Sequence, residues 1–264
     1  MTYEPMVREG VFLRTRINDN SLAHIWFLHG FGESSLSFKE VFFSELVESY
    51  SLFVPDLPGF GVSPAQPERM SLEGATEVTL SLINVLSRNK AVLLVGHSLG
   101  SVIATRIARK LGETVKGVFS IEGNLTRSDG YFSAQAADFQ QADAFYRYFL
   151  DLIYKRAENS EVHQRYLASV RFASPEAMMA WGRSSGRLSE SGTHGFDFVA
   201  LKCQKTYYWS MESTPKETQD FIVKYNIPNR QYTGAGHWPM IETPDECYSA
   251  ISRFFASILA QNIT

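Results

Sequence analysis

The sequence predicts an α/β fold built on a mostly parallel sheet with flanking helices. Runs such as "AVLLV", residues 91–95, are apolar without alternation, as expected of a strand buried on both faces of a parallel sheet. Helical periodicity follows several of these runs, and strand alternating with helix favours right-handed crossovers within one sheet. From residue 124 to about residue 201 there is no convincing strand pattern but several helical stretches, which predicts a helical insertion.

Six stretches have the composition of strands, and most end at a glycine or another turn-forming residue. They are "VFLRTRI" (11–17), "AHIWFL" (23–28), "YSLFVP" (50–55), "AVLLV" (91–95), "VKGVFSI" (115–121) and "KTYYWS" (205–210). A further strand begins "NRQYTGAG" (229–236). Together these stretches predict the strands of one sheet, with the candidate functional residues in the loops that follow them.

Helix starts are marked by capping residues. Ser71 precedes an apolar stripe from Leu72 to Leu86, and its hydroxyl can accept from the N–H groups of the first turn. Ser174-Pro175-Glu176 and Thr243-Pro244-Asp245 each combine a cap, a first-turn proline and an acidic residue. Inside the insertion, one helical face is formed by Phe145, Tyr148, Phe149, Leu152 and Ile153.

Composition limits the class of partner. The 264 residues include 25 Lys and Arg against 28 Asp and Glu, so no strong field attracts nucleic acid or an anionic membrane, and we expect a small-molecule partner. Apolar stretches are far shorter than the roughly 20 residues of a membrane span, and "MTYEPMVREG" contains no apolar run. We therefore expect a soluble, cytoplasmic protein without a signal peptide or a membrane span.

Cysteine and histidine spacing gives no sign of a metal or a disulfide framework. Cys203 and Cys247 are the two cysteines of the chain, and neither has the paired His or Cys spacing of a zinc site. We expect both to be packing residues and expect neither a metal nor an organic cofactor. The sequence makes no prediction of oligomeric state.

The stretch "GHSLG", residues 96–100, places Ser98 between a buried-type strand and a helical stripe. A sharp turn from strand to helix lifts a serine above the sheet edge, and glycines two positions to either side give the backbone room. A structural turn is the alternative, but the strand before it and the helix after it favour a nucleophile. A serine hydroxyl needs a base near pH 7.

His237 is the best-placed base among the six histidines. It lies in "YTGAGHWPMIETP", a glycine-containing loop between the final strand and the last helix, from which a side chain can reach the carboxyl edge of the sheet. We expect structural roles for the other five histidines.

These motifs resemble those of the α/β-hydrolase superfamily over nearly the whole chain, in its lidded serine hydrolase branch. The resemblance rests on "LHGFGES", "PDLPGFGVS", "GHSLG" and "GAGHWPMIETP", in that order. It implies an eight-stranded sheet, with Ser98 as nucleophile and His237 as base. It also implies that residues 1–123 and 202–264 form the core, and that residues 124–201 form a lid inserted between strands six and seven.

The resemblance also implies an oxyanion hole. Two preorganised backbone N–H groups can stabilise the negative charge on a carbonyl oxygen in acyl transfer, each by roughly 3 kcal/mol. Leu99, after the nucleophile, would supply one donor, and Phe31, after "HG", the other. A loop whose glycines merely turn the chain is the alternative interpretation of "HGFGES".

The acid is the point at which the sequence departs from the family pattern. An aspartate normally follows the seventh strand, but Ser213 stands at that position, and a hydroxyl cannot stabilise an imidazolium as a carboxylate does. Glu122, at the end of the sixth strand, matches the layout of a branch of haloalkane dehalogenases and is the expected acid. Glu212 is the runner-up, and a Ser-His dyad stays open. Glu122 could instead hydrogen-bond the hinge of the lid at Gly123-Asn124.

The sequence therefore predicts a serine hydrolase that cleaves a carboxylic ester, thioester or amide of a small, largely apolar substrate. Serine at the elbow argues against dehalogenase and epoxide hydrolase chemistry, which would need a carboxylate nucleophile. Two alternatives stay open: a C–C bond hydrolase or lyase with the same serine and histidine, and a small-molecule receptor with a weakly active triad. Aromatic side chains of the insertion, such as Tyr131, Phe132 and Trp181, could line an apolar pocket.

Overall fold

An eight-stranded sheet runs through the centre of the computed structural model, which describes residues 3–21 and 23–261. The strands are β1 (Glu4–Arg8), β2 (Val11–Arg16), β3 (Ala23–Leu28), β4 (Tyr50–Pro55), β5 (Ala91–His97), β6 (Val115–Ile121), β7 (Gln204–Trp209) and β8 (Asn229–Gln231). Their order is β1-β2-β4-β3-β5-β6-β7-β8. The β1–β2 and β2–β4 pairs are antiparallel and the other pairs are parallel, which confirms the mostly parallel sheet.

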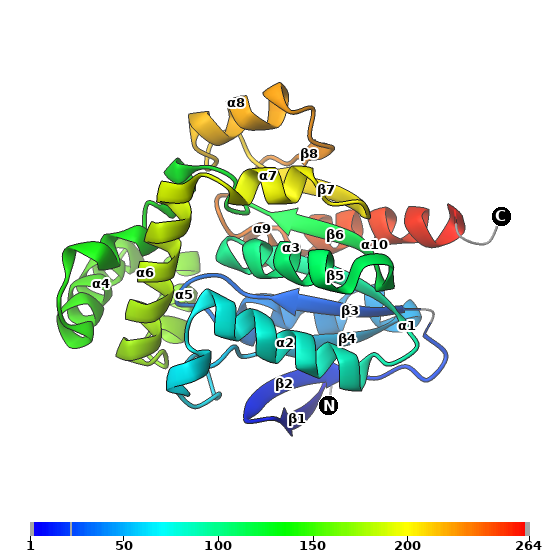
Figure 1. Ribbon diagram of the computed structural model, residues 1–264, viewed down its shortest axis with the longest axis horizontal. Coiled ribbons are helices and arrows are strands. Elements are labelled where there is room, and N and C mark those ends of the chain that lie inside the picture. The colour runs from blue at the N-terminus through cyan, green and yellow to red at the C-terminus, as the bar shows by residue number, and fades with distance from the viewer. Residues whose placement is uncertain (1–2, 22, 262–264) are drawn as a thin grey trace.

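Helices cover both faces of this sheet. They are α1 (Leu46–Ser49), α2 (Leu72–Leu86), α3 (Leu99–Leu111), α4 (Ala142–Ala157), α5 (Glu161–Val170), α6 (Pro175–Ser191), α7 (His194–Val199), α8 (Lys216–Lys224), α9 (Pro239–Glu242) and α10 (Pro244–Gln261). Short 3₁₀ segments span Ser35–Phe43, Pro67–Arg69, Gly112–Thr114, Arg127–Gly130 and Ser133–Asp138. In Figure 1, α2 and α3 lie in front of the sheet, and α1 and α10 lie behind it.

The predicted helix starts are confirmed by their hydrogen bonds. Ser71 Oγ accepts from the Gly74 N–H at 3.0 Å, and Ser174 Oγ accepts from the Ala177 N–H at 3.2 Å. The last helix begins at Pro244, as its cap motif predicts. Satisfying an N–H that has no partner within the first turn stabilises each helix by roughly 1 kcal/mol.

Two strands differ from the sequence-based expectation. β1 lies at the edge of the sheet, pairs with β2, and has four exposed residues of five, so it shows no apolar alternation that could predict it. β8 spans three residues and ends where Tyr232 begins the turn towards Gly234, whose φ of +77° suits glycine. Both deviations concern edge strands, where burial gives the weakest pattern.

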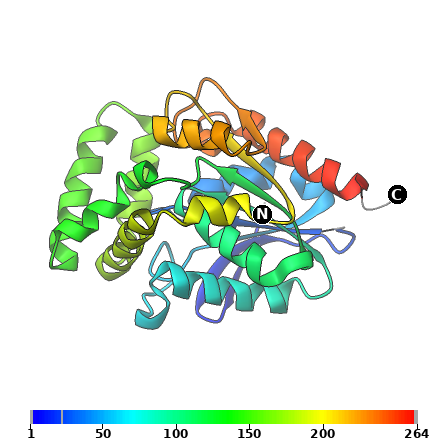
Figure 2. The same ribbon diagram turned by 45° about the horizontal axis from the view of Figure 1, so that its top comes forward.

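Between β6 and β7, the described chain forms helices and 3₁₀ segments and no strand. Phe145, Phe149 and Ile153 of α4 are buried, whereas Tyr148 is 43% exposed and turns away from the core. Helices α4, α5 and α6 gather at one end of the sheet in Figures 1 and 2, whereas α10 extends towards the other end. We refer to residues 124–201 as the cap.

The parallel strands point their carboxyl ends towards the cap, so the loops that follow β3, β5, β6, β7 and β8 meet at one edge. These loops carry Phe31, Ser98, Glu122, Ser213 and His237 respectively. Among the described residues, no helix has both the length and the apolarity needed to cross a bilayer.

Two glycines of α6 provide a test of how the cap packs. A Cβ at Gly182 would lie 2.3 Å from the Ala136 Cβ, whereas a Cβ at Gly186 would meet no atom within 4 Å. Gly182→Ala should therefore lower the free energy of unfolding by roughly 1–3 kcal/mol through overpacking. Gly186→Ala should raise it by up to about 1 kcal/mol through helix propensity. Urea unfolding of both variants measures the two changes, and equal effects would contradict this packing.

Candidate active site

Ser98 stands at the sharp turn between β5 and α3. Its φ of 50° and ψ of −124° are unusual for a residue with a side chain, and such strain is typical of a nucleophile elbow. The turn needs glycine nearby because a Cβ at Gly100 would lie 2.1 Å from the Leu28 carbonyl oxygen. The Ser98 N–H donates to the Ile121 carbonyl at 3.0 Å, which ties the elbow to the end of β6.

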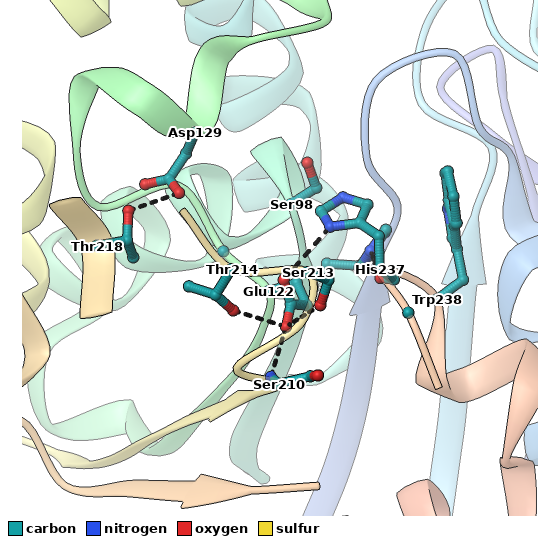
Figure 3. Close-up of polar contacts among 12 residues, drawn as sticks. Ser98, Glu122, Asp129, Ser210, Ser213, Thr214, Thr218, His237 and Trp238 are labelled. Carbon is teal, nitrogen blue, oxygen red and sulfur yellow. Dashed lines mark hydrogen bonds and ion pairs between the residues drawn. The ribbon is translucent and has the colours of Figure 1, made fainter. Parts of the chain in front are cut away.

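Glu122 follows β6 and is held in a cage of hydrogen bonds. Its Oε1 accepts from the Ser210 N–H at 2.8 Å, from Ser213 Oγ at 3.0 Å and from Thr214 Oγ1 at 2.8 Å. The Tyr232 hydroxyl lies 2.9 Å from the same oxygen. Ser213, which stands where the family pattern has an aspartate, thus donates a hydrogen bond to the Glu122 carboxylate (Figure 3).

The second oxygen of Glu122 faces the predicted base. Oε2 lies 3.5 Å from His237 Nδ1, and the two side chains point towards each other in Figure 3. Burial opposes ionisation of Glu122, but contact with His237 and the donors of the cage lower the pKa of the carboxyl below its ordinary value. Glu122 is therefore a buried carboxylate that can orient the imidazole and stabilise its protonated form. Glu212 is exposed, and its N–H donates to Ser210 Oγ at 3.1 Å.

Ser98 and His237 line the same small cavity beneath the cap. In this structure, Ser98 Oγ donates to Asn124 Oδ1 at 3.4 Å, and Figure 3 shows the serine beside the imidazole ring. The cavity measures about 20 Å³, which is room for one water-sized group. A larger hollow of about 690 Å³ lies at the opposite edge of the strands, where none of the predicted site residues is found.

A buried ion pair lies directly beneath the elbow. His97 Nδ1 is 2.8 Å from Glu33 Oε1, and both side chains are almost fully enclosed. The Trp238 indole N–H donates to the same oxygen at 2.9 Å, and His97 Nε2 donates to the His237 carbonyl at 2.8 Å. The pair therefore joins the loop after β3, the end of β5 and the loop that carries His237.

The two members of the pair hold each other in their charged forms. Burial raises the pKa of the Glu33 carboxyl, but contact with His97 and the donor of Gly30 outweigh it and lower the pKa to about 2. Burial likewise lowers the pKa of His97, but the Glu33 carboxylate outweighs it and the pKa rises above its ordinary value of 6.5. Their mutual stabilisation depends on both being ionised.

The two predicted oxyanion donors belong to residues close to Ser98, one next to it in sequence and one in the wall of the same cavity. Leu99 is the first residue of α3, so its N–H has no acceptor within the helix. Phe31 is buried in the loop after β3, and it lines the cavity together with Ser98. The Leu99 N–H and the Phe31 N–H therefore stay the predicted oxyanion donors.

Few of the predicted aromatic residues reach this cavity. Tyr131 and Phe132 line it, whereas Trp181 packs edge-on against Phe60, with ring centroids 4.7 Å apart. The other wall residues were not predicted from the sequence; they are Glu33, Asp129, Ser133, Tyr166 and Trp238. The first and last of these stand inside or beside recognised motifs, "GFGES" and "GHW", and could have been found there. Tyr166 lies in an ordinary amphipathic helix and gives no such signal.

Within the described part of the chain, no group of three or more His, Cys, Asp or Glu side chains could hold a metal ion. Cys247 is buried and Cys203 is half-buried, and both are free thiols. Neither cysteine belongs to the wall of the cavity that Ser98 and His237 line.

A family model described as "Alpha/beta hydrolase family" matches residues 27–250. The chain belongs to the alpha/beta hydrolase family. A Mycoplasma pneumoniae protein named as an esterase/lipase is 36% identical over 93 residues, which are 35% of this chain and 34% of that protein. The biotin biosynthesis bifunctional protein BioHC of Cellvibrio japonicus is 36% identical over 113 residues, 42% of this chain and 21% of that protein. The chain thus spans about a third or less of these curated relatives.

Solved structures of the family share the fold. An esterase from Thermogutta terrifontis, solved with malate bound, superimposes with a TM-score of 0.73 at 20% identity and covers 97% of each chain. The N-acyl homoserine lactonase AidH, complexed with N-butanoyl homoserine, gives a TM-score of 0.73 at 19% identity, over 98% of this chain and 97% of that one. These likenesses establish the eight-stranded fold for this chain.

The ion pair beneath the elbow predicts a pH-dependent loss of stability in Glu33→Gln. The folded pKa of Glu33 is about 2 against an ordinary 4.5, so its contribution is present above pH 4.5 and is lost as pH falls towards 2. The raised pKa of His97 gives a contribution that is present below pH 6.5 and is lost as pH rises through the folded value. At pH 5–6, Glu33→Gln should lower the free energy of unfolding by about 3 kcal/mol.

Urea unfolding at pH 3, 5.5 and 9 measures this dependence. Glu40→Gln is the matched control, because Glu40 pairs with Arg165 at 2.9 Å where both side chains are partly exposed. The control should cost less than about 1 kcal/mol at every pH. A Glu33→Gln effect that is the same at pH 3 and pH 5.5 would contradict the charged pair.

Proposed function

We propose that this protein is a serine hydrolase that cleaves carboxylic esters of small, largely apolar substrates through an acyl-enzyme on Ser98. The observation that carries the proposal is the contact between Glu122 Oε2 and His237 Nδ1, 3.5 Å apart, beside the strained Ser98 elbow. Because Nδ1 faces the carboxylate, Nε2 is the nitrogen left to take the serine proton. The names of the esterase relatives agree with this activity.

The first half of the reaction forms the acyl-enzyme. The Ser98 hydroxyl turns from Asn124 towards His237, loses its proton to Nε2 and attacks the ester carbonyl, so that a bond forms between Oγ and the carbonyl carbon. The N–H groups of Phe31 and Leu99 stabilise the oxyanion. The C–O bond to the alcohol then breaks, and His237 returns the proton to the leaving oxygen.

Water completes the second half by the same route. His237 takes a proton from water as the hydroxyl attacks the acyl carbon, and the proton then returns to Ser98 as the acid leaves. Glu122 stays ionised throughout and stabilises the imidazolium, for which its lowered pKa suits it. Because the cavity of about 20 Å³ has room for one water-sized group in this structure, the smallest esters are the first substrates to test.

A small organophosphate, diethyl 4-nitrophenyl phosphate, tests the nucleophile. Attack by Ser98 would form a bond to phosphorus and release nitrophenolate, leaving one diethylphosphoryl group that intact-mass spectrometry detects. We expect one group on the wild type and on Ser191→Ala, whose serine is exposed on the cap. Ser98→Ala should take up none. A folded wild-type protein that gains no group would overturn the proposal and favour a receptor.

The reaction class is tested by comparing the rates at which the protein hydrolyses nitrophenyl acetate and a vinylogous diketone. Turnover of the ester supports the proposal. Turnover of the diketone alone would instead identify a C–C bond hydrolase that uses the same serine.

The choice of acid is tested by Glu122→Gln and Glu212→Gln. Without the carboxylate, the imidazole loses both its orientation and the stabilisation of its positive charge, so kcat for nitrophenyl acetate should fall roughly 10³–10⁴-fold in Glu122→Gln. Glu212→Gln should keep kcat within about twofold, because its side chain is exposed. Thermal unfolding checks that both variants fold. Near-normal turnover by a folded Glu122→Gln variant would remove Glu122 from the triad.

A further inference from the structure

Helix α5 of the cap contacts the loop after β3 and the 3₁₀ segment that follows it (Ser35–Phe43) at three points. The Tyr166 hydroxyl donates to the Phe31 carbonyl at 2.7 Å, and Ser169 Oγ lies 3.2 Å from Ser34 Oγ. Arg165 forms an ion pair with Glu40 at 2.9 Å. Residues 165, 166 and 169 share one face of the helix, since residues three and four apart are neighbours on its surface. One face of α5 therefore makes all three contacts with the segment after β3.

Tyr166 is buried among aromatic side chains. Its ring lies 5.1 Å from the Trp238 ring and meets Phe149 edge-on at 6.3 Å, so the side chain is packed between the base-bearing loop and the cap. The loop after β3 passes close to the Tyr166 hydroxyl at Gly32. Gly32 has a φ of +68°, and a Cβ there would lie 2.8 Å from the Tyr166 oxygen. A glycine at this position is required for both reasons.

Three hydrogen bonds, one of them from the Tyr166 hydroxyl, hold the consecutive peptide groups around Phe31. The Gly30 N–H donates to Glu33 Oε2 at 3.1 Å. The Gly30 carbonyl, which belongs to the same peptide as the Phe31 N–H, accepts from His29 Nδ1 at 2.9 Å. The Phe31 carbonyl accepts from Tyr166. Of these three contacts, the last is the one that the cap supplies.

We propose that Tyr166 is a positioning residue, through which the cap helix α5 fixes the direction of the Phe31 N–H in the oxyanion hole. The inference rests on the proposed function, because it takes Phe31 as an oxyanion donor. A donor stabilises the transition state only if it already points at the developing charge, and an N–H that must be reoriented during the reaction loses much of its effect. The cap therefore takes part in setting the catalytic rate as well as covering the cavity.

Tyr166→Phe tests this inference because it removes the hydroxyl and keeps the ring. Tyr146→Phe is the matched control, since the Tyr146 hydroxyl also donates to a backbone carbonyl, that of Val170, at 3.1 Å within the cap. For nitrophenyl acetate, kcat should fall at least 10-fold in Tyr166→Phe with KM within about twofold, because the lost stabilisation belongs to the transition state. The rate of labelling by the organophosphate should fall in parallel. Tyr146→Phe should change none of these values.

Amide hydrogen exchange supplies a readout that does not depend on activity. In Tyr166→Phe, exchange of the peptide that covers residues 30–36 should rise at least threefold, and in Tyr146→Phe it should match the wild type. Unchanged exchange, or an unchanged kcat in an enzyme that the organophosphate labels, would overturn the inference. A wild type that the organophosphate does not label would instead overturn the proposed function, and the exchange data would then decide alone whether Tyr166 fixes the loop.

Discussion

The buried Glu33–His97 ion pair is the interaction on which the geometry of the site depends. It links three segments that are far apart in sequence: the loop after β3, the end of β5 and the loop that carries His237. Taking both charges out of water is costly, so such a pair persists only where further donors satisfy it, here Gly30 and the Trp238 indole. Because each charge of the pair is stable only beside the other, the three segments are held in fixed positions relative to one another.

The cage around Glu122 is a second constraint, at the other side of His237. Four groups surround one carboxylate oxygen, which leaves the other oxygen directed at the imidazole. His237 is thus held through its backbone carbonyl by His97 and faces Glu122 with its ring. Fixing a residue through both its backbone and its side chain gives the imidazole a narrow range of orientations, which is what proton transfer requires.

Much of the fold and of the site was predictable because both follow from local pattern. Buried strands, capped helices and the "GHSLG" elbow have signatures within a dozen residues, and Glu122 could be proposed from its place at a strand end. The edge strand β1 and the wall residue Tyr166 could not be predicted. The first has too little burial to impose alternation, and the second acquires its place through packing of a cap helix on a distant loop.

Ser213 and Glu122 lie after neighbouring strands, and the carboxylate that faces His237 comes from the loop after β6, not from the loop after β7. Ser213 stands where the family pattern has the acid, so a comparison at that position alone would find no carboxylate in this chain. The Ser213 hydroxyl instead donates a hydrogen bond to the Glu122 carboxylate, which follows the neighbouring strand. The residue at that one position therefore does not tell whether a carboxylate faces the histidine, because a neighbouring strand can supply it.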